Sequence, residues 1–206
     1  MNLLFDNKKK QSIFLPLFIP IIFTIAISFT SFFIHQADEG DIIFYYNAGH
    51  EILYGDSSNV FIPNAGIGWP TTLAFFTEYV NDVYVVSKSI AIIASGLTIF
   101  ITFFIIKNIS NNLKIAFITQ VFLAINPFVH EDSIILNNEM LPLFFIFLSI
   151  YFLTKNNFTK KYVLVGLFLG ISFLFRYQAI FILFGIIVYL IVSNQAVRHK
   201  IKEIIL

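Results

Sequence analysis

The basic and acidic residues of this chain form alternating blocks separated by long apolar runs, and no other feature constrains the fold as strongly. Lys8, Lys9 and Lys10 precede the first apolar run, and a block of acids follows it. A membrane sorts loops in this way, because cytoplasmic loops carry an excess of Lys and Arg. The blocks therefore predict an integral membrane protein with a basic side and an opposite, acidic side.

The composition supports a membrane environment. The chain has 206 residues, of which 58% are hydrophobic and 18% aromatic, more than a water-soluble domain can hide. The formal net charge of +1 gives no basic surface for nucleic acid, so no nucleic-acid partner is indicated. The chain has no cysteine, which excludes a disulfide framework and a thiolate metal site.

Six apolar runs approach the length of a membrane span. They cover residues 13–34, 83–106, 115–129, 136–154, 162–175 and 179–192. Helices are expected, because an isolated strand would leave its backbone amides unpaired in hydrocarbon. We therefore expect an all-α membrane protein with about six transmembrane helices in a single domain over residues 1–206.

The positions of the cations orient this predicted bundle. If Lys8, Lys9 and Lys10 are cytoplasmic, every cation except Lys88 and Arg176 falls on the same side. These further cations are Lys107, Lys114, Lys155, Lys160, Lys161, Arg198, Lys200 and Lys202. The expectation is a multi-pass protein of the plasma membrane with a cytoplasmic N-terminus.

The first outer loop, residues 35–82, is long and contains apolar residues of its own. Residues 41–54 are expected to form a short helix that ends near Gly55. The glycines and prolines up to Pro70 favour turns, and residues 71–80 are expected to form a second, amphipathic helix on the membrane interface. Trp69 is a residue type that favours the headgroup boundary.

Asp38, Glu39 and Asp41 form an acidic cluster directly after the first run. Repulsion and desolvation near lipid favour a carboxylate that takes up a proton, so a general base, a metal ligand or a hydrogen-bonding group is indicated. The alternative is an acidic turn exposed to solvent.

A second polar cluster lies in the next outer loop and comprises His130, Glu131, Asp132, Asn137, Asn138 and Glu139. It is expected to meet the first cluster. Glu139 opens the fourth run, where an acid can also act as a structural cap at the positive end of the helix dipole. His130 alone is no metal signature.

Arg176 is the one charge between the fifth and sixth runs. These runs have about fourteen residues each, or roughly 21 Å of helix against a hydrocarbon core of about 30 Å. Arg176 is therefore expected below the outer surface, unless the bilayer thins and flanking residues extend to the interface. A guanidinium at this depth suits phosphate oxygens, although a carboxylate from either acidic cluster would also satisfy it.

The order of these features resembles the N-terminal half of the GT-C membrane glycosyltransferases, in the mannosyltransferase and aminoarabinose-transferase-like group. The matching pieces are the acidic loop, residues 45–49 and 52–55, Gly68, Trp69 and Pro70, Asn126 and Pro127, residues 138–141, and residues 166–176. Each motif is loose, and their order and spacing carry the resemblance.

The resemblance implies transfer of a sugar from a polyprenyl-phosphate donor to an acceptor hydroxyl on the extracytosolic side. In that family an acid of the first outer loop is catalytic. Here Asp41 fits the spacing best and Asp38 comes next, while the pair of Asp38 and Glu39 resembles the dyad of some members. Arg176 is the leading phosphate partner and Lys88 a weaker one. Tyr45, Tyr46, Asn138 and Glu139 are the other candidate substrate-binding residues.

Further partners follow from the same resemblance. Glu131, Asp132 and Glu139 are candidates to orient the acceptor or hold a divalent cation, although no spacing specifies an ion. The acceptor is expected to be a protein or a lipid-linked molecule, in contact with membrane lipid. Family members are usually longer, so a second polypeptide is a candidate to complete the fold.

Two other functions are compatible with the sequence. One is a noncatalytic membrane subunit, or degenerate relative, that binds polyprenyl phosphate or scaffolds another transferase. The other is a small transporter, which is disfavoured because its polar residues would be expected near the membrane midplane.

Overall fold

A computed structural model describes residues 18–33, 39–55, 66–127, 129, 139–155 and 160–193, and these residues form helices and connections without any strand. The helices are Phe18–Phe29, the 3-10 helix η1 (Thr30–Phe33), α2 (Glu39–Tyr54), α3 (Gly68–Val80), α4 (Val83–Ser110), α5 (Leu113–Ala124), α7 (Met140–Thr154), α8 (Lys161–Phe175) and α9 (Ala179–Ser193). The predicted all-α fold is confirmed.

The long helices coincide with the apolar runs of the sequence. Among the described helices, α4 alone is long and apolar enough to cross a membrane. The helix Phe18–Phe29 and helices α5, α7, α8 and α9 are apolar but shorter. The six runs were thus correctly predicted as helices as far as they are described, and their crossing of a membrane stays a prediction.

Two tight connections bound α4, and each is built from two neighbouring polar residues. Asn81 ends α3 and Asn111 ends α4 in the left-handed conformation, with φ of 59° and 52°. Asn tolerates this conformation better than most residues. The next residue then starts a helix: the Asp82 carboxylate accepts a hydrogen bond from the backbone N–H of Tyr84 at 2.9 Å, and Asn112 caps α5 in the same way.

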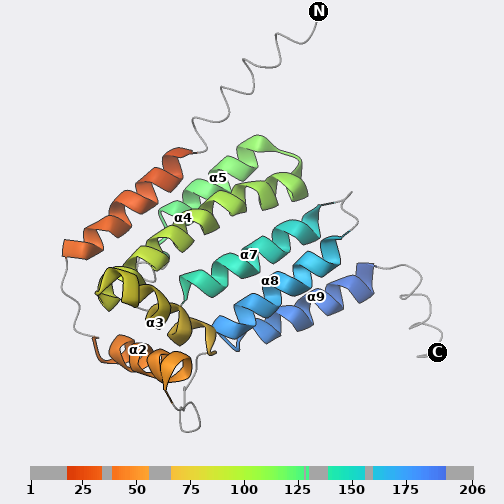
Figure 1. The fold of residues 1–206 in the computed structure, drawn as a ribbon. Coiled ribbons are helices and arrows are strands. Elements are labelled where there is room, and N and C mark those ends of the chain that lie inside the picture. Colours follow the sequence, from red (N-terminus) through yellow and green to blue (C-terminus); the bar gives the residue numbers. More distant parts are fainter. Residues whose placement is uncertain are drawn as a thin grey trace, which may run out of the picture.

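The charges of the described residues collect at two ends of the helix array (Figure 1). The end that holds α2, α3, the starts of α4 and α7, and the connection from α8 to α9 is here called the acidic end. The opposite, basic end holds the end of α4, the start of α5, the end of α7 and the start of α8. There Asn108 Nδ2 of α4 donates to Thr154 Oγ1 of α7 at 3.2 Å. The acidic end carries Asp41, Glu51, Glu78, Asp82 and Glu139, and the basic end carries Lys107, Lys114, Lys155, Lys160 and Lys161. Apart from the cations Lys88 and Arg176, which lie toward the acidic end, the separation of charges along the sequence is therefore also a separation in space among the described residues.

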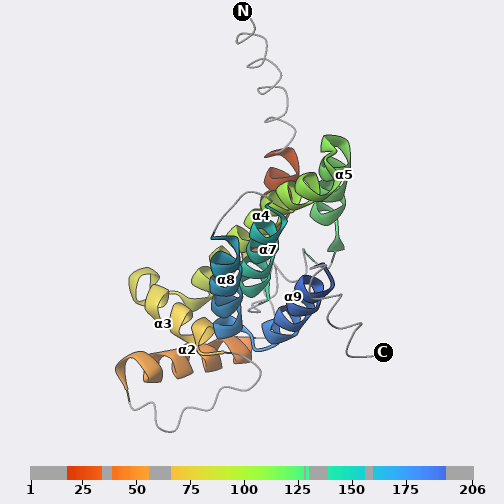
Figure 2. The same ribbon diagram turned by 90° about the vertical axis from the view of Figure 1, so that its right-hand side faces the viewer.

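Helices α2 and α3 form a layer across the acidic end of the longer helices, as Figure 2 shows. Their contact with α4 is a core of Ile42, Trp69, Leu73 and Val86, all at most 4% exposed. Leu141 of α7 and Phe175 of α8 pack against the same core. Burial of these apolar side chains fixes α2 and α3 on the ends of three other helices.

The start of α3 differs from the sequence-based expectation. The segment Gly68, Trp69 and Pro70 was predicted as a turn, but it forms the first turn of the helix. Proline is tolerated there because the first N–H groups of a helix have no intrahelical acceptor. The expected position of Trp69 at the headgroup boundary was also wrong, since its side chain is 1% exposed and lies in the core.

Helices α2 and α3 approach each other most closely at Gly49. A Cβ atom at this position would clash with the backbone carbonyl of Pro70. A backbone atom cannot move aside as a flexible side chain can. The close packing of α2 against α3 therefore requires glycine at position 49.

We predict that Gly49→Ala lowers the thermal unfolding midpoint of the detergent-solubilised chain, at a cost of about 1–3 kcal/mol from overpacking. The matched control is Gly185→Ala on α9, where an added Cβ meets no atom within 4 Å. Alanine also has the better helix propensity, so this control is expected to keep or raise the midpoint. Equal midpoints for the two variants would contradict the close packing of α2 on α3.

Candidate active site

Arg176 lies in the short break between α8 and α9. Its backbone is extended, with φ of −151° and ψ of 120°. The Arg176 N–H still donates to the carbonyl of Ser172 at 2.8 Å, and its own carbonyl accepts from Ala179, the first residue of α9, at 3.1 Å. The predicted interruption between the fifth and sixth apolar runs is thus three residues long and places a cation at the acidic end.

The Arg176 guanidinium is held by two side chains. Its Nη1 forms an ion pair with Oε1 of Glu139, and its Nε donates to Oε1 of Gln178 at 2.9 Å. The Arg176 and Glu139 side chains are 26% and 31% exposed, so the pair is half-buried and reachable from outside. The charge-assisted pairing fixes the direction of the guanidinium.

This pairing decides between two sequence-based hypotheses. Glu139 precedes α7, but its side chain forms no capping hydrogen bond with that helix, so the prediction of a capping side chain was wrong. Of the carboxylates proposed as partners of Arg176, that of Glu139 in the second acidic cluster forms the ion pair, and binding of a phosphate by Arg176 stays a prediction. Glu139 precedes α7 and Arg176 follows α8. Their ion pair is therefore a long-range contact that local sequence spacing does not reveal.

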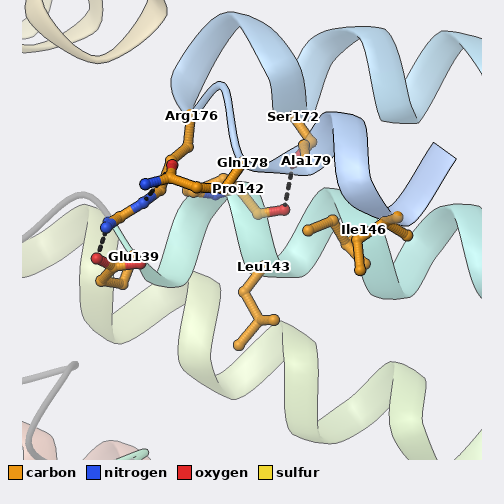
Figure 3. A pocket seen from close by; sticks show the side chains of 9 residues that line it. Glu139, Pro142, Leu143, Ile146, Ser172, Arg176, Gln178 and Ala179 are labelled. Carbon is orange, nitrogen blue, oxygen red and sulfur yellow. Dashed lines mark hydrogen bonds and ion pairs between the residues drawn. The ribbon is translucent and has the colours of Figure 1, made fainter. Parts of the chain in front are cut away.

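A pocket of about 200 Å³ opens beside the ion pair, between α7, α8 and α9. In Figure 3 the Arg176 and Glu139 side chains point toward each other at one end of the pocket, and Ile146 lies at the other. The lining residues are Glu139, Pro142, Leu143, Ile146, Ser172, Arg176, Gln178, Ala179 and Ile182. The pocket is thus polar at the acidic end and apolar deeper between the helices.

A buried hydrogen bond fixes the wall of this pocket. Ser172 Oγ of α8 donates to the carbonyl oxygen of Pro142 in α7 at 2.9 Å. Neither Ser172 nor Gln178 was given a role from the sequence. The signal for Gln178 was its position two residues after the isolated arginine, whereas Ser172 lies inside an apolar run without any distinguishing pattern.

Asp41 and Tyr45 of α2 do not line this pocket, although helix α2 lies across the same end of the longer helices (Figure 2). Burial raises the pKa of the Tyr45 hydroxyl above its ordinary value, the Asp41 carboxylate raises this pKa further, and the Arg176 guanidinium lowers it. Tyr45 and Phe175, the residue before Arg176, pack against the same core, so α2 meets the end of α8 at this tyrosine. Asp41 itself is exposed, at the first turn of α2.

The chain at the start of α3 lies against the end of α8. The backbone N–H of Gly66 donates to the carbonyl of Phe175 at 3.1 Å. Side chains at Gly66 or Gly68 would clash with or crowd the carbonyl of Leu174. Two glycines therefore let the chain before α3 lie directly against the last turn of α8, next to Arg176.

The remaining predicted site residues fall into two groups. Tyr46 and Lys88 do not line the pocket: Tyr46 packs against His50 with ring centroids 6.2 Å apart, and Lys88 is buried on α4 at 9% exposure. Glu39 begins α2, but its side chain is not described. Four candidates lie outside the described residues, namely Asp38, Glu131, Asp132 and Asn138.

The described residues offer no cluster of metal ligands. Within them, no three His, Asp or Glu side chains gather in an arrangement that would hold a metal ion. The weak candidates Glu131 and Asp132 are not among them.

We predict opposite shifts of the Tyr45 pKa in two variants. Asp41→Asn removes a negative charge that disfavours the phenolate, so the Tyr45 pKa falls, whereas Arg176→Gln removes a cation that favours the phenolate, so it rises. Tyrosinate absorbance followed from neutral to alkaline pH, after subtraction of a Tyr45→Phe titration, measures both shifts.

Tyr54 supplies the control for this titration. Its pKa is raised first by a hydrogen bond with Glu78, so Glu78→Gln lowers the Tyr54 pKa and leaves that of Tyr45 in place. A Tyr45 titration that is unmoved by Asp41→Asn and by Arg176→Gln would show that the three groups do not share a site.

Comparison with known proteins identifies the family. The family model described as dolichyl-phosphate-mannose-protein mannosyltransferase matches residues 66–206, from the start of α3 onward and including Glu139 and Arg176. Helix α2 with Asp41 precedes the matched residues. No curated protein and no solved structure matches the chain. The family consists of membrane glycosyltransferases that use a polyprenyl-phosphate-linked sugar, and the resemblance found in the sequence is confirmed. The chain belongs to the dolichyl-phosphate-mannose-protein mannosyltransferase family.

Proposed function

We propose that the chain transfers a sugar from a polyprenyl-phosphate donor to an acceptor hydroxyl, with Asp41 as the general base and Arg176 as the phosphate-binding residue. The observation that carries the proposal is that Tyr45 of α2 and Phe175, the residue before Arg176, pack against the same core. The pKa of the Tyr45 hydroxyl also responds to the charges of both Asp41 and Arg176. This packing brings the first turns of α2, with Asp41, and the break that holds Arg176 to the same end of the helices.

The proposed sugar transfer needs one negatively charged and one positively charged side chain. The carboxylate takes the proton of the acceptor hydroxyl as its oxygen attacks the anomeric carbon, and the bond between that carbon and the phosphate oxygen breaks. The bonding electrons leave with the polyprenyl phosphate, whose growing negative charge a fixed guanidinium stabilises. The proton then resides on Asp41 until solvent removes it.

The neighbours of Arg176 prepare it for this role. Glu139 and Gln178 hold the Nη1 and Nε edges of the guanidinium, which reduces the reorganisation required when a phosphate arrives. Because the raised pKa of Tyr45 keeps its hydroxyl protonated at neutral pH, this hydroxyl can donate a hydrogen bond to a sugar or phosphate oxygen.

The proposed setting is a single membrane domain. In it, the six apolar helices cross the plasma membrane, the N-terminus is cytoplasmic, and the acidic end faces outward. The excess of lysines at the opposite end supports this orientation. The acceptor is a protein or a lipid-linked molecule, and a second polypeptide is a candidate partner in completing its binding site.

One observation favours a second candidate, a noncatalytic subunit that binds polyprenyl phosphate. The family match includes the proposed phosphate-binding residue Arg176 and its partner Glu139, and it begins after the proposed base Asp41. A chain that binds the lipid phosphate without transferring sugar would have this second function.

We predict that Asp41→Asn lowers kcat for sugar transfer roughly 10²–10⁴-fold, the range for loss of a general base, with little change in donor binding. The assay uses membranes supplied with a polyprenyl-phosphate sugar. The matched control is Asp82→Asn, which makes the same change at the acidic end while keeping a good helix cap for α4, and it is expected to retain full activity.

The outcomes separate the candidates. Full activity of Asp41→Asn would show that Asp41 is not the general base and would leave Asp38 and Glu39 as the candidates. Binding of polyprenyl phosphate by the unaltered chain, with no transfer under any condition, would favour the noncatalytic subunit.

A further inference from the structure

Glu139 and Arg176 give the pocket between α7, α8 and α9 a balanced charge. They are the two charged side chains among the described residues that line it. Both side chains are partly exposed, at 31% and 26%, so a ligand that enters from the acidic end meets the carboxylate as well as the guanidinium. A phosphate bound at Arg176 would therefore also lie next to a negative charge.

The proposed reaction changes the charge of the lipid phosphate. In the donor, the phosphate is bonded to both the prenyl chain and the sugar, and such a diester carries one negative charge. When the bond to the anomeric carbon breaks, its electrons stay with the phosphate oxygen, and the product is a monoester. A phosphate monoester loses its second proton near pH 6 and carries close to two negative charges at neutral pH. A cation alone would thus hold the product more tightly than the donor.

The position of Glu139 opposes this tight binding of the product. Its Oε1 is paired with Nη1 of Arg176, so the second charge of a monoester at the guanidinium is attracted by the cation and repelled by the carboxylate. Gln178, which holds the Nε of Arg176, is neutral. Of these two side chains that hold the guanidinium, only Glu139 can discriminate between ligands of different charge.

We infer that Glu139 is a specificity-determining residue that lets Arg176 accept a singly charged phosphate diester and promotes release of the doubly charged monoester. The inference rests on the proposed function and adds to it a means of limiting inhibition by the product. No covalent step is assigned to Glu139. A side chain that served only to hold the guanidinium could be replaced by glutamine, whose oxygen also accepts a hydrogen bond.

Other ionisable groups at the acidic end belong to the same electrostatic setting. Asp41 and Tyr45 are on α2, Tyr177 is in the break between α8 and α9, and Lys88 is on α4. None of these residues lines the pocket. Because the pKa of Tyr45 is raised above its ordinary value, this residue keeps its proton between about pH 5 and pH 8 and adds no change of charge over that range.

The inference is tested with a short-chain prenyl phosphate monoester and its methyl ester, which share one hydrocarbon chain. The methyl ester carries one negative charge throughout, whereas the monoester carries about one near pH 5 and nearly two near pH 8. Equilibrium binding of both to the full chain in lipid nanodiscs gives the ratio of their dissociation constants. In the unaltered chain, the monoester is expected to gain little over the methyl ester between these pH values.

Glu139→Gln removes the negative charge and keeps an oxygen for Arg176. Near pH 8 this variant is expected to strengthen binding of the monoester relative to the methyl ester roughly five- to tenfold at low salt, the effect of one charge pair in a partly solvated site. Near pH 5 the ratio is expected to match that of the unaltered chain. Glu139→Asp keeps the charge and is expected to keep the ratio at both pH values. The matched control is Glu78→Gln on α3, outside the pocket, which is expected to bind like the unaltered chain.

Two results would overturn the inference. One is the same ratio of dissociation constants for Glu139→Gln and the unaltered chain near pH 8. The other is a several-fold gain of the monoester over the methyl ester between about pH 5 and pH 8 in the unaltered chain, a measurement that does not depend on the folding of any variant.

The remaining outcomes distinguish this inference from the proposed function. Arg176→Gln is expected to weaken binding of both ligands, and unchanged binding would exclude Arg176 as the phosphate site and overturn the inference as well. If Glu139→Gln shifts the ratio as expected but the unaltered chain transfers no sugar, the role of Glu139 stands and the enzyme proposal fails. If sugar is transferred but Glu139→Gln leaves the ratio unchanged, the enzyme proposal stands and the inference fails.

Discussion

The arrangement of the acidic end depends on a charge that the surrounding apolar helices cannot accommodate alone. Arg176 interrupts two apolar helices, and a guanidinium near hydrocarbon requires partners. Glu139 and Gln178 supply them, and this pairing joins the start of α7 to the break between α8 and α9. Because leaving either member of a half-buried pair unpaired is costly, the ion pair holds three helix ends together and fixes one wall of the pocket.

The layer of α2 and α3 adds an acid to this cation. Burial of Ile42 and Trp69 holds the two helices across the ends of the bundle, and the contact of Gly66 with Phe175 brings them against the last turn of α8. Ordinary apolar packing thus accounts for the electrostatic influence of Asp41 and Arg176 on one tyrosine. Within the proposed mechanism the same arrangement places a base and a phosphate-binding group at one end of the bundle.

The sequence predicted the features that local patterns determine. Apolar runs located the long helices, the polar residues at Asn81 and Asp82 fit a helix boundary, and the isolated Arg176 marked the site. It did not predict features that depend on distant contacts. Pro70 was read as a turn residue, although at the start of a helix it costs nothing. Trp69 was assigned to the interface because its burial requires α2 and α4 to be in place. The choice of Glu139 between capping α7 and pairing with Arg176 depends on α8, which lies more than twenty residues later in the chain.

The central claim is that Asp41 and Arg176 act on the same, outer side of one membrane protein. In this cysteine-free chain, single substitutions Asp41→Cys, Tyr177→Cys and Asn111→Cys each introduce the only thiol, and an impermeant thiol reagent reports their exposure in intact cells. Asp41→Cys and Tyr177→Cys are expected to be labelled from outside, and Asn111→Cys, at the basic end, only after permeabilisation. Labelling of positions 41 and 177 from opposite sides of the membrane would contradict it.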